Sequence, residues 1–223
     1  MSILNAGLGG AAVATAGRGP RGGTLKRAFD FTCALLMLIA FLPLMGFVAL
    51  LMQSFDRGPV LFGHSRIGFN GRVFKCLKFR SMVPDAAEVL ERHLAENPAA
   101  RAEWDASQKL RDDPRVTALG RFLRSTSLDE LPQLINVLRG DMSLVGPRPI
   151  VHAELPRYGS DVEAYMAARP GITGLWQVSG RSDTDYDRRV QLDSEYVQNW
   201  SLFGDVAILL RTVKVVFSRS GSY

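Results

Sequence analysis

The sequence predicts a mainly α-helical fold with a small β-hairpin, in which a re-entrant membrane helix-break-helix precedes a compact cytoplasmic domain with interfacial amphipathic helices. Three observations carry this prediction: one almost wholly apolar run near the N-terminus, two strand-like segments joined by Asn70-Gly71, and several helix-like segments after them. The 223 residues, 47% of them hydrophobic, suffice for one compact domain of ordinary size. A second full domain is not expected.

The composition limits the classes of partner that the protein is expected to bind. A formal net charge of +5 predicts an anionic partner, which on charge alone could be nucleic acid, an acidic lipid surface or a phosphorylated substrate. No helix-turn-helix, zinc-finger or RNA-recognition pattern is found, so nucleic acid is not expected as the partner. Cys33 and Cys76 fit neither a disulfide framework nor a metal knuckle, which indicates reduced thiols in a cytoplasm-facing protein.

The chain divides into three parts. Residues 1–24 are rich in Gly and Ala without apolar periodicity, and we expect a disordered tail there. Residues 25–55 form the membrane segment, because Phe31 to Met52 is almost wholly apolar and approaches the roughly 20 residues that a spanning helix needs. Residues 56–223 form the cytoplasmic and interfacial domain.

The path of the membrane segment follows from charge and one proline. Lys26 and Arg27 precede the apolar run, which places the N-terminus in the cytoplasm. A straight span would export everything after Met52, although the remainder is rich in Lys and Arg. Pro43 removes one helical hydrogen bond and marks a break, so we expect the segment to return to the cytoplasmic face. The alternative is a kinked but spanning signal anchor, which hydropathy alone would favour.

Two elements follow the membrane segment. Val60 to Phe79 predicts a β-hairpin that turns at Asn70-Gly71. Asp85 to Leu110 is rich in Ala, Glu and Arg and predicts one or two helices interrupted at Pro98.

Three more helices are predicted after these. Thr126 to Arg139 combines a Ser127–Glu130 capping box with an apolar stripe of leucines. Thr184 to Trp200 and Ser201 to Phe217 predict two further helices, of which the second is apolar enough to lie in the membrane interface.

An acidic pair on the helix at Thr126 to Arg139 is the candidate for chemistry. Asp129 shares a polar stripe with Gln133 and Asn136, and Glu130 projects beside it. On the helix alone, ordinary capping would explain both acids, at roughly 0.3–1 kcal/mol each. The surrounding positive charge favours the handling of a metal-bridged diphosphate, whose charge must be neutralised before a carboxylate approaches. The cations of this set are Lys75, Lys78, Arg80, Arg115, Arg121, Arg124, Arg139 and Arg148.

Five motifs then occur in order: Lys78-Phe79-Arg80-Ser81-Met82, Asp113 to Thr117, Ser127 to Gln133, Gly146 to Pro149, and Pro170 to Gln177. Together they resemble the monotopic polyprenyl-phosphate sugar-1-phosphate transferases (phosphoglycosyltransferases) of bacteria, over a stretch from about Leu25 to the C-terminus. Within that family the chain is most similar to the undecaprenyl-phosphate galactose phosphotransferases that begin exopolysaccharide synthesis. One departure is Leu42, which precedes Pro43 where many relatives carry Ser.

The resemblance implies an activity. It implies transfer of a sugar-1-phosphate from a UDP-sugar to undecaprenyl phosphate, with release of UMP, at the cytoplasmic face of the bacterial inner membrane. Galactose is the expected sugar, with glucose and N-acetylated sugars left open. Asp129 would be the covalent nucleophile and Glu130 its partner, and both would hold the Mg²⁺ cofactor.

The resemblance also implies binding residues and partners. We expect the substrate to be bound by Lys78, Arg80, Arg115, Arg124, Pro147, Arg148, Pro149 and Arg181. Inner-membrane lipid and downstream glycosyltransferases are implied as partners, and a homodimer is left open. The alternative is a non-catalytic, membrane-anchored scaffold or regulator of polysaccharide assembly, from which UMP release would distinguish a transferase.

Overall fold

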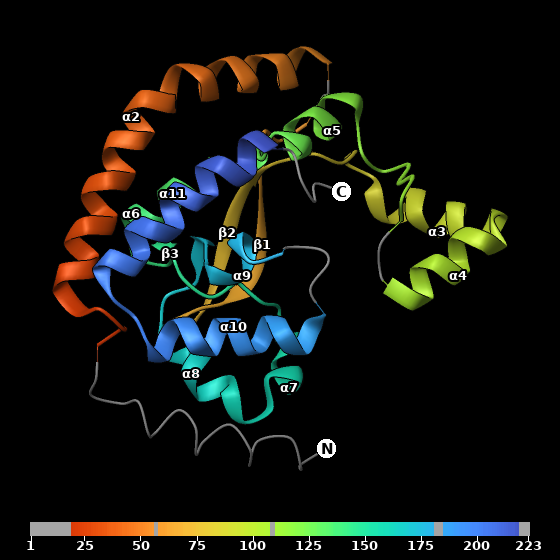
Figure 1. Ribbon diagram of the computed structural model, residues 1–223. Coiled ribbons are helices and arrows are strands. Elements are labelled where there is room, and N and C mark those ends of the chain that lie inside the picture. Colours follow the sequence, from red (N-terminus) through yellow and green to blue (C-terminus); the bar gives the residue numbers. More distant parts are fainter. Residues whose placement is uncertain (1–18, 56–57, 108–109, 181–184, 219–223) are drawn as a thin grey trace.

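The computed structural model describes residues 19–55, 58–107, 110–180 and 185–218 and confirms a mostly helical fold (Figure 1). Of the predicted disordered tail, residues 1–18 lie outside the described residues, and Gly23 and Thr24 already belong to the first helix. The helices are α2 Gly23–Phe55, α3 Ala86–Glu96, α4 Pro98–Ser107, α5 Ala118–Ser125, α6 Gln133–Arg139, α7 Leu155–Tyr158, α8 Val162–Met166, α9 Leu175–Val178, α10 Tyr186–Gln198 and α11 Leu202–Ser218. The strands are β1 Leu61–Ile67, β2 Val73–Phe79, β3 Ser143–Val145 and β4 Gly171–Thr173, and short 3₁₀ turns are η1 Phe69–Gly71, η2 Leu128–Glu130, η3 His152–Glu154 and η4 Gly159–Asp161.

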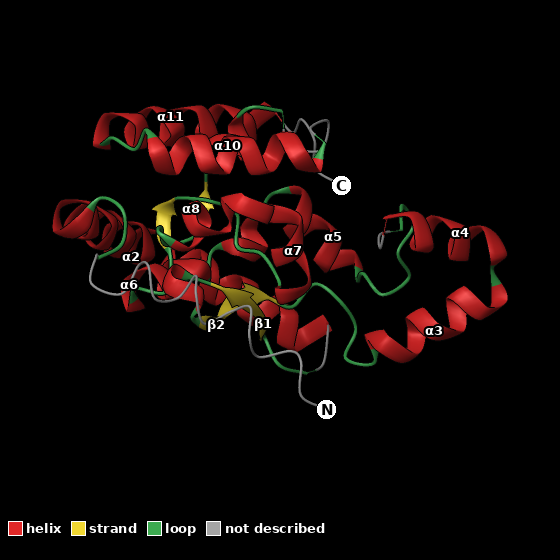
Figure 2. Ribbon diagram, turned by 90° about the horizontal axis from the view of Figure 1, so that it is seen from below, coloured by secondary structure: helices red, strands yellow, loops and turns green. Residues whose placement is uncertain are grey.

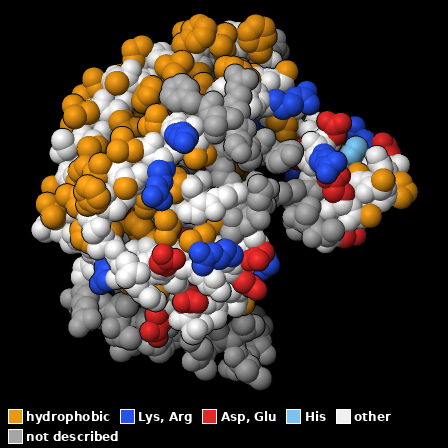
Figure 3. All heavy atoms as spheres, viewed as in Figure 1, with side chains coloured by type: hydrophobic (Ala, Val, Ile, Leu, Met, Phe, Trp, Pro, Cys, Tyr) orange, Lys and Arg blue, Asp and Glu red, His pale blue; other side chains and the backbone are white. Residues whose placement is uncertain are grey.

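Helix α2 is the long apolar element. Within the described ranges it is the one helix long and apolar enough to cross a membrane, with 33 residues and only 17% of its most apolar window buried. Its outward side chains, such as Leu36, Ile39 and Leu50, are more than 60% exposed. Hydrophobic side chains cover the outer surface of α2 and continue toward α11 in the space-filling view (Figure 3). This apolar surface is suited to association with a membrane.

The predicted break takes the form of a bend inside one helix. Helix α2 continues through Pro43, and its course turns between its two halves (Figure 1). Its first half packs on α6, whereas Met45, Val48 and Met52 of its second half pack against Phe79 and Leu123. A proline removes only one N–H donor, so the turns on either side can stay helical while the axis bends.

Buried polar contacts hold the start of α2 to the domain. Lys26 Nζ lies 2.6 Å from Asp205 Oδ2 of α11 and 3.9 Å from Asp30 Oδ1. Asp30 accepts hydrogen bonds from Ser143 Oγ at 2.7 Å and from the Leu144 amide at 3.1 Å, at strand β3. All three ionisable side chains are at least 95% buried, so each needs these partners to offset its desolvation. Helix α2 is therefore fixed in position and register.

The β-hairpin is confirmed. Strands β1 and β2 pair antiparallel, with Leu61 opposite Phe79 and Ile67 opposite Val73, and the chain reverses at Asn70, whose φ is 55°. Helix α6 packs against β2, because Asn136 accepts a hydrogen bond from the Leu77 amide at 2.9 Å and donates one to the Lys75 carbonyl at 2.8 Å. This single fully buried amide links helix and hairpin.

Most other predicted helices are also confirmed. Helices α3 and α4 meet at Pro98, as expected, and both views show them projecting away from the rest of the molecule (Figures 1 and 2). Helices α10 and α11 match the two predicted C-terminal helices, and both lie on the same side of the molecule in Figure 2.

The predicted continuous helix from Thr126 to Arg139 is wrong. The chain forms the 3₁₀ turn η2 and then α6, which begins only after Pro132. Ser127 takes a left-handed φ of 57° and makes no capping hydrogen bond through its side chain, so the predicted capping box is absent. Pro132 has no N–H to bond to Leu128, and the left-handed residue ends the preceding helix, so no regular helix can run through this segment.

A cluster of buried side chains around Tyr158 and Tyr165 contacts a carboxyl group, that of Asp193, whose pKa is raised. Tyr158 and Tyr165 pack edge to face, with ring centroids 5.1 Å apart, and Tyr158 Oη donates to Asp193 Oδ2 at 2.8 Å. Burial raises the pKa of Asp193 to about 7, although the Tyr158 hydrogen bond and the nearby Arg189 oppose the shift.

The Lys26–Asp205 contact generates the first prediction. Asp205→Asn should destabilise the protein by about 3–5 kcal/mol, because it leaves the buried Lys26 ammonium with one carboxylate at 3.9 Å. Unfolding of detergent-solubilised protein measures the loss. Asp187→Asn, at an exposed carboxylate of α10, is the matched control and should change little. Equal stability of the two variants would show that the contact does not hold α2 in place.

The Asp193 carboxyl generates a pH prediction. Because its pKa rises from 3.8 to about 7 on folding, the folded state binds the proton more tightly than the unfolded state between those values. Its contribution to stability is therefore complete at the acid end of this window and is lost as the pH rises through about 7. We expect wild type to lose stability relative to Asp193→Asn over this window, measured as unfolding midpoints in detergent at each pH. Parallel pH profiles would refute it.

Candidate active site

The acidic pair lies on η2, directly after a strained residue. Ser127 adopts the left-handed conformation, uncommon for a residue with a side chain, and turns the chain sharply at the end of α5. Asp129 follows and is 7% exposed, whereas Glu130 is about one-third exposed. The turn thus presents one sheltered and one accessible carboxylate on consecutive residues.

Lys78 of β2 lies against both carboxylates. Its Nζ is 2.6 Å from Glu130 Oε1 and 3.6 Å from Asp129 Oδ2. Lys78 and Glu130 are 52 positions apart in the sequence. The packing of α6 on the hairpin brings them together. Three of the predicted site residues therefore form one group.

The electrostatics of this group are governed by burial. Burial raises the pKa of Asp129, and the charge of Glu130 adds to the rise, whereas Lys78 and Arg124 oppose it. Burial would by itself lower the pKa of Lys78, but the two carboxylates outweigh this and raise it. Lys78 is therefore a fixed cation in the site, and its charge favours the ionised form of Asp129.

Arg124 is the second cation near the pair. It lies on α5, is within electrostatic reach of Asp129, and donates through Nε to Ser81 Oγ at 2.8 Å. This hydrogen bond ties the guanidinium to the motif from Lys78 to Met82. Residues of two sequence motifs, Lys78 to Met82 and Ser127 to Gln133, thus lie at one site.

Two other predicted binding residues are engaged within the chain. Arg80 is 8% exposed and donates to the carbonyls of Pro59 at 2.8 Å and Met82 at 3.2 Å. Arg115 donates twice to Asp113, at 2.8 and 2.6 Å, and its guanidinium carbon lies 5.0 Å from the centre of the Trp104 ring. Both arginines hold loops beside the site, and substrate binding by them stays a prediction. Arg181 lies outside the described residues.

The motif from Gly146 to Pro149 follows strand β3. A side chain at Gly146 would collide with the backbone carbonyl of Arg169, which explains why glycine occupies this position beside the β3–β4 pair. The loop then presents Arg148, whose guanidinium carbon lies 5.2 Å from the centre of the Trp176 ring. Pro147 and Pro149 flank it and restrict the backbone.

Several neighbours of Arg148 were missed at the level of sequence. Glu154 of η3 lies 2.9 Å from Arg189 Nη2 and 3.7 Å from Arg66 Nη1, and Arg189 also lies over Trp176. Trp176 belongs to a motif that was recognised, but no pattern in the sequence connects it with Arg66 or Arg189. Only the fold brings these segments together.

The acidic pair has the donor set for magnesium handling. No group of three or more His, Cys, Asp or Glu side chains suited to a metal ion occurs in the part of the chain that the structure describes. Magnesium is commonly held by one or two carboxylates, with substrate phosphates and water completing its shell. Asp129 and Glu130 supply two carboxylates on adjacent residues, so they fit an ion that arrives with a diphosphate.

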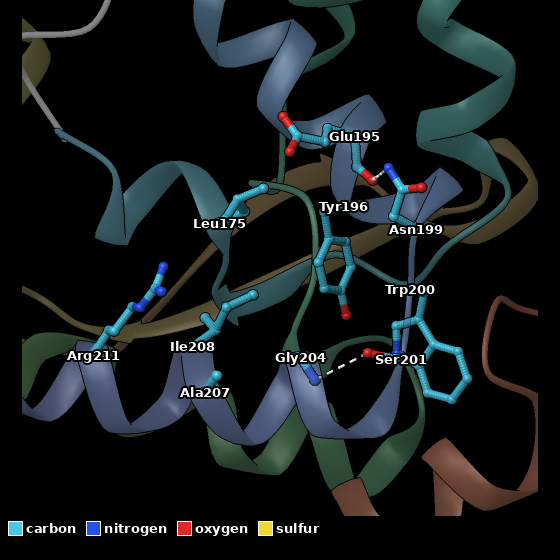
Figure 4. Close-up of a pocket in the computed structure, with 10 residues that line it drawn as sticks. All are labelled: Leu175, Glu195, Tyr196, Asn199, Trp200, Ser201, Gly204, Ala207, Ile208 and Arg211. Carbon is cyan, nitrogen blue, oxygen red and sulfur yellow. Dashed lines mark hydrogen bonds between the residues drawn. The ribbon is translucent and has the colours of Figure 1, made fainter.

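A separate pocket of about 220 Å³ lies between α9, α10 and α11 (Figure 4). Tyr196 and Ile208 project into it, with Arg211 and Glu195 on opposite sides. None of the predicted catalytic or binding residues lines it.

Known proteins resemble this chain over most of its length. The model of the "Bacterial sugar transferase" family matches residues 22–219. The chain is 58% identical over 199 residues to the undecaprenyl-phosphate galactose phosphotransferase of Salmonella typhimurium strain LT2, covering 89% of the chain and 42% of that relative. It is 57% identical over 199 residues to the UDP-galactose-lipid carrier transferase of Erwinia amylovora, with the same coverage of 89% and 42%.

A shorter relative aligns over nearly its whole length. The exopolysaccharide production protein ExoY of Sinorhizobium fredii strain NBRC 101917 / NGR234 is 52% identical over 204 residues, which covers 92% of the chain and 90% of that relative. The chain thus spans less than half the length of the Salmonella and Erwinia relatives but nearly all of this one. Since the family model covers most of the chain, including every motif described above, the chain belongs to the bacterial sugar transferase family.

Proposed function

We propose that this protein transfers a sugar-1-phosphate, galactose-1-phosphate in the first instance, from a UDP-sugar to undecaprenyl phosphate, as the first membrane step of exopolysaccharide synthesis. The observation that carries the proposal is the Asp129–Glu130–Lys78 group, held on the same body as the apolar helix α2. The names of the Salmonella, Erwinia and Sinorhizobium relatives support the carrier lipid, the sugar and the biological role.

In the first step, an Asp129 carboxylate oxygen attacks the β-phosphorus of the UDP-sugar. The bond from that phosphorus to the oxygen bridging the two phosphates breaks, and UMP leaves with the bond's electron pair. An acyl phosphate on Asp129 remains. Lys78 and Arg124 stabilise the charge that develops on the phosphoryl oxygens and the departing UMP, because Lys78 lies 3.6 Å from Asp129 and Arg124 is within electrostatic reach of it.

In the second step, a phosphate oxygen of undecaprenyl phosphate attacks the same phosphorus. The Asp129–phosphorus bond breaks, which regenerates the carboxylate and yields the lipid diphosphate sugar. Asp129 and Glu130 would hold the magnesium ion, which would neutralise diphosphate charge. Donor and acceptor need not be bound together, which suits a nucleophile close to an apolar surface.

We further propose that α2 re-enters the cytoplasmic face of the inner membrane. Its first turns are fixed to α6 and α11, where Arg27 donates to the Val137 and Leu138 carbonyls, and its last turns pack against Phe79 and Leu123. One domain outside the bilayer thus contacts α2 near both of its ends. A helix that crossed the bilayer straight would carry its two ends to opposite sides, which these contacts argue against.

The nucleophile is tested by trapping. With donor alone, purified wild type should gain one phosphosugar, which hydroxylamine removes because it cleaves acyl phosphates. Asp129→Asn should form no adduct and release UMP at least roughly 10³-fold more slowly, because an amide is a poor nucleophile. Asp112→Asn, at an exposed neighbouring carboxylate, should behave as wild type. An adduct mapped by peptide mass spectrometry to another residue would overturn the assignment.

Membrane topology is tested by thiol labelling in intact cells. The two natural cysteines are replaced, as Cys33→Ala and Cys76→Ala, and single reporters are introduced by Gly19→Cys and Pro59→Cys, before and after α2. Both reporters should resist a membrane-impermeant reagent until the cells are opened, whereas a permeant reagent should label both at once. Labelling of one reporter alone in unbroken cells would show a spanning helix.

A further inference from the structure

An exposed phenylalanine lies opposite Lys78 on the β-hairpin. In the β1–β2 register Phe62 pairs with Lys78, and His64 pairs with Cys76. Directly opposite residues of an antiparallel pair point to the same face of the sheet, with their Cβ atoms about 5 Å apart. Since Lys78 contacts both carboxylates of the acidic pair, the Phe62 side chain lies beside the candidate active site.

This face of the hairpin is buried at one end and open at the other. Phe74 and Cys76 are at most 7% exposed and belong to the main hydrophobic core. Lys78 is about one-third exposed, and Phe62 is 53% exposed. An exposed aromatic ring does not gain the free energy that its burial would give. A ligand that covered Phe62 would gain it, at the end of the face where Asp129 lies.

A second ring lies against Phe62. The rings of Phe62 and His64 stack, with their centroids 6.1 Å apart and their planes inclined by 26°. Burial lowers the pKa of His64, and the charges of Arg66 and of two nearby lysines lower it further, although a carboxylate opposes them. The imidazole is therefore neutral at pH 7. The stacking limits rotation of the Phe62 ring, so that the ring offers a ligand a flat surface of defined orientation.

The face of a hexose ring suits such a surface. Sugars stack on aromatic rings through the C–H groups of one face, which contact the negative face of the π system. In galactose the hydrogens of C3, C4 and C5 form one apolar patch on the face opposite the axial 4-hydroxyl. In glucose the C4 hydrogen points to the other face. The α-linked phosphate of UDP-galactose leaves C1 on the same side as the apolar patch.

We infer that Phe62 is a specificity-determining residue for the sugar of the donor, an inference that rests on the proposed function. Its ring stacks on the C3–C4–C5 face of galactose while the β-phosphate lies at Lys78 and Asp129. Phosphate and apolar patch lie on one side of the sugar, and Lys78 and Phe62 lie on one side of the hairpin, so both contacts form together. The stacking favours galactose over glucose, whose matching face lacks the C4 hydrogen.

The rival occupant of this surface is the polyprenyl chain of the acceptor. A hydrocarbon chain would also cover an aromatic ring. Phe62, however, lies between the Lys78 ammonium and the His64 imidazole, whose polar atoms a hydrocarbon would separate from water without replacing their hydrogen bonds. Sugar hydroxyls can donate to and accept from such groups. The neighbours of Phe62 therefore favour the sugar.

The experiment first measures binding without turnover, by calorimetry of detergent-solubilised protein with magnesium. An Asp129→Asn background keeps the donor intact. Phe62→Leu keeps an apolar side chain but removes the flat ring, and should weaken UDP-galactose by about fivefold, the effect of one aromatic stacking contact. It should weaken UDP-glucose less and leave UDP unchanged. Phe62→Tyr keeps the ring face and should bind UDP-galactose as its parent does.

Turnover then separates donor from acceptor. With Asp129 intact, Phe62→Leu should raise the KM for UDP-galactose by a similar factor with little change in kcat, because the stacking is present before and during the reaction. The KM for undecaprenyl phosphate should not change. Phe203→Leu, at an 85% exposed phenylalanine of α11, is the matched control and should behave as wild type. Unfolding midpoints establish that each variant is folded.

Two outcomes would refute the inference: unchanged affinity for UDP-galactose in Phe62→Leu, or a rise confined to the KM for undecaprenyl phosphate, which would assign the ring to the lipid. Either could occur in an enzyme that transfers galactose-1-phosphate, so the proposed function would stand. Conversely, galactose-selective binding that depends on Phe62 in a protein that transfers no sugar phosphate would uphold the inference and refute the proposed function.

Discussion

The fixed position of α2 depends on the buried contact between Lys26 and Asp205. Asp205 is fully buried and accepts from Lys26, from Tyr196 Oη at 2.8 Å and from Trp200 Nε1 at 3.0 Å, so it joins α2, α10 and α11. Asp30, one turn along α2, binds strand β3 in the same way. Polar groups buried here lose their hydrogen bonds to water, so each needs a full set of protein partners. This requirement fixes the position of the apolar helix on the domain.

The position of the acidic pair depends indirectly on these buried contacts of α2. Strand β3 is bound to Asp30, and Asn136 of α6 links the backbone of β2 at two points. These contacts fix the short segment between α5 and α6 opposite Lys78, so a turn with little regular structure carries Asp129 to a defined place. The Ser127 backbone strain is tolerated because the elements on both sides are held independently.

The hairpin, the α3–α4 pair and the last two helices could be predicted because each is encoded locally, by Asn70-Gly71, by Pro98 or by apolar periodicity. The segment from Thr126 to Arg139 could not, because its leucines repeat with helical spacing while Pro132 and the left-handed Ser127 interrupt the backbone. In the site, Asp129 and Lys78 were found by motif. Arg66 and Arg189 were not, because their nearness to Arg148 is a product of tertiary packing alone.

The unequal contacts of Lys78 give the two carboxylates different tasks in the proposed mechanism. Glu130 makes the 2.6 Å contact and remains about one-third exposed, whereas Asp129 is 3.6 Å from the ammonium and nearly buried. A nucleophile needs a free lone pair and little water around it, because hydration lowers its reactivity and water would hydrolyse the acyl phosphate. Asp129 meets both needs, because it is nearly buried and because Glu130, not Asp129, makes the shorter contact with the Lys78 ammonium. Glu130 is better placed to meet an incoming cation at the surface, and Lys78 remains beside Asp129 as the developing phosphoryl charge approaches.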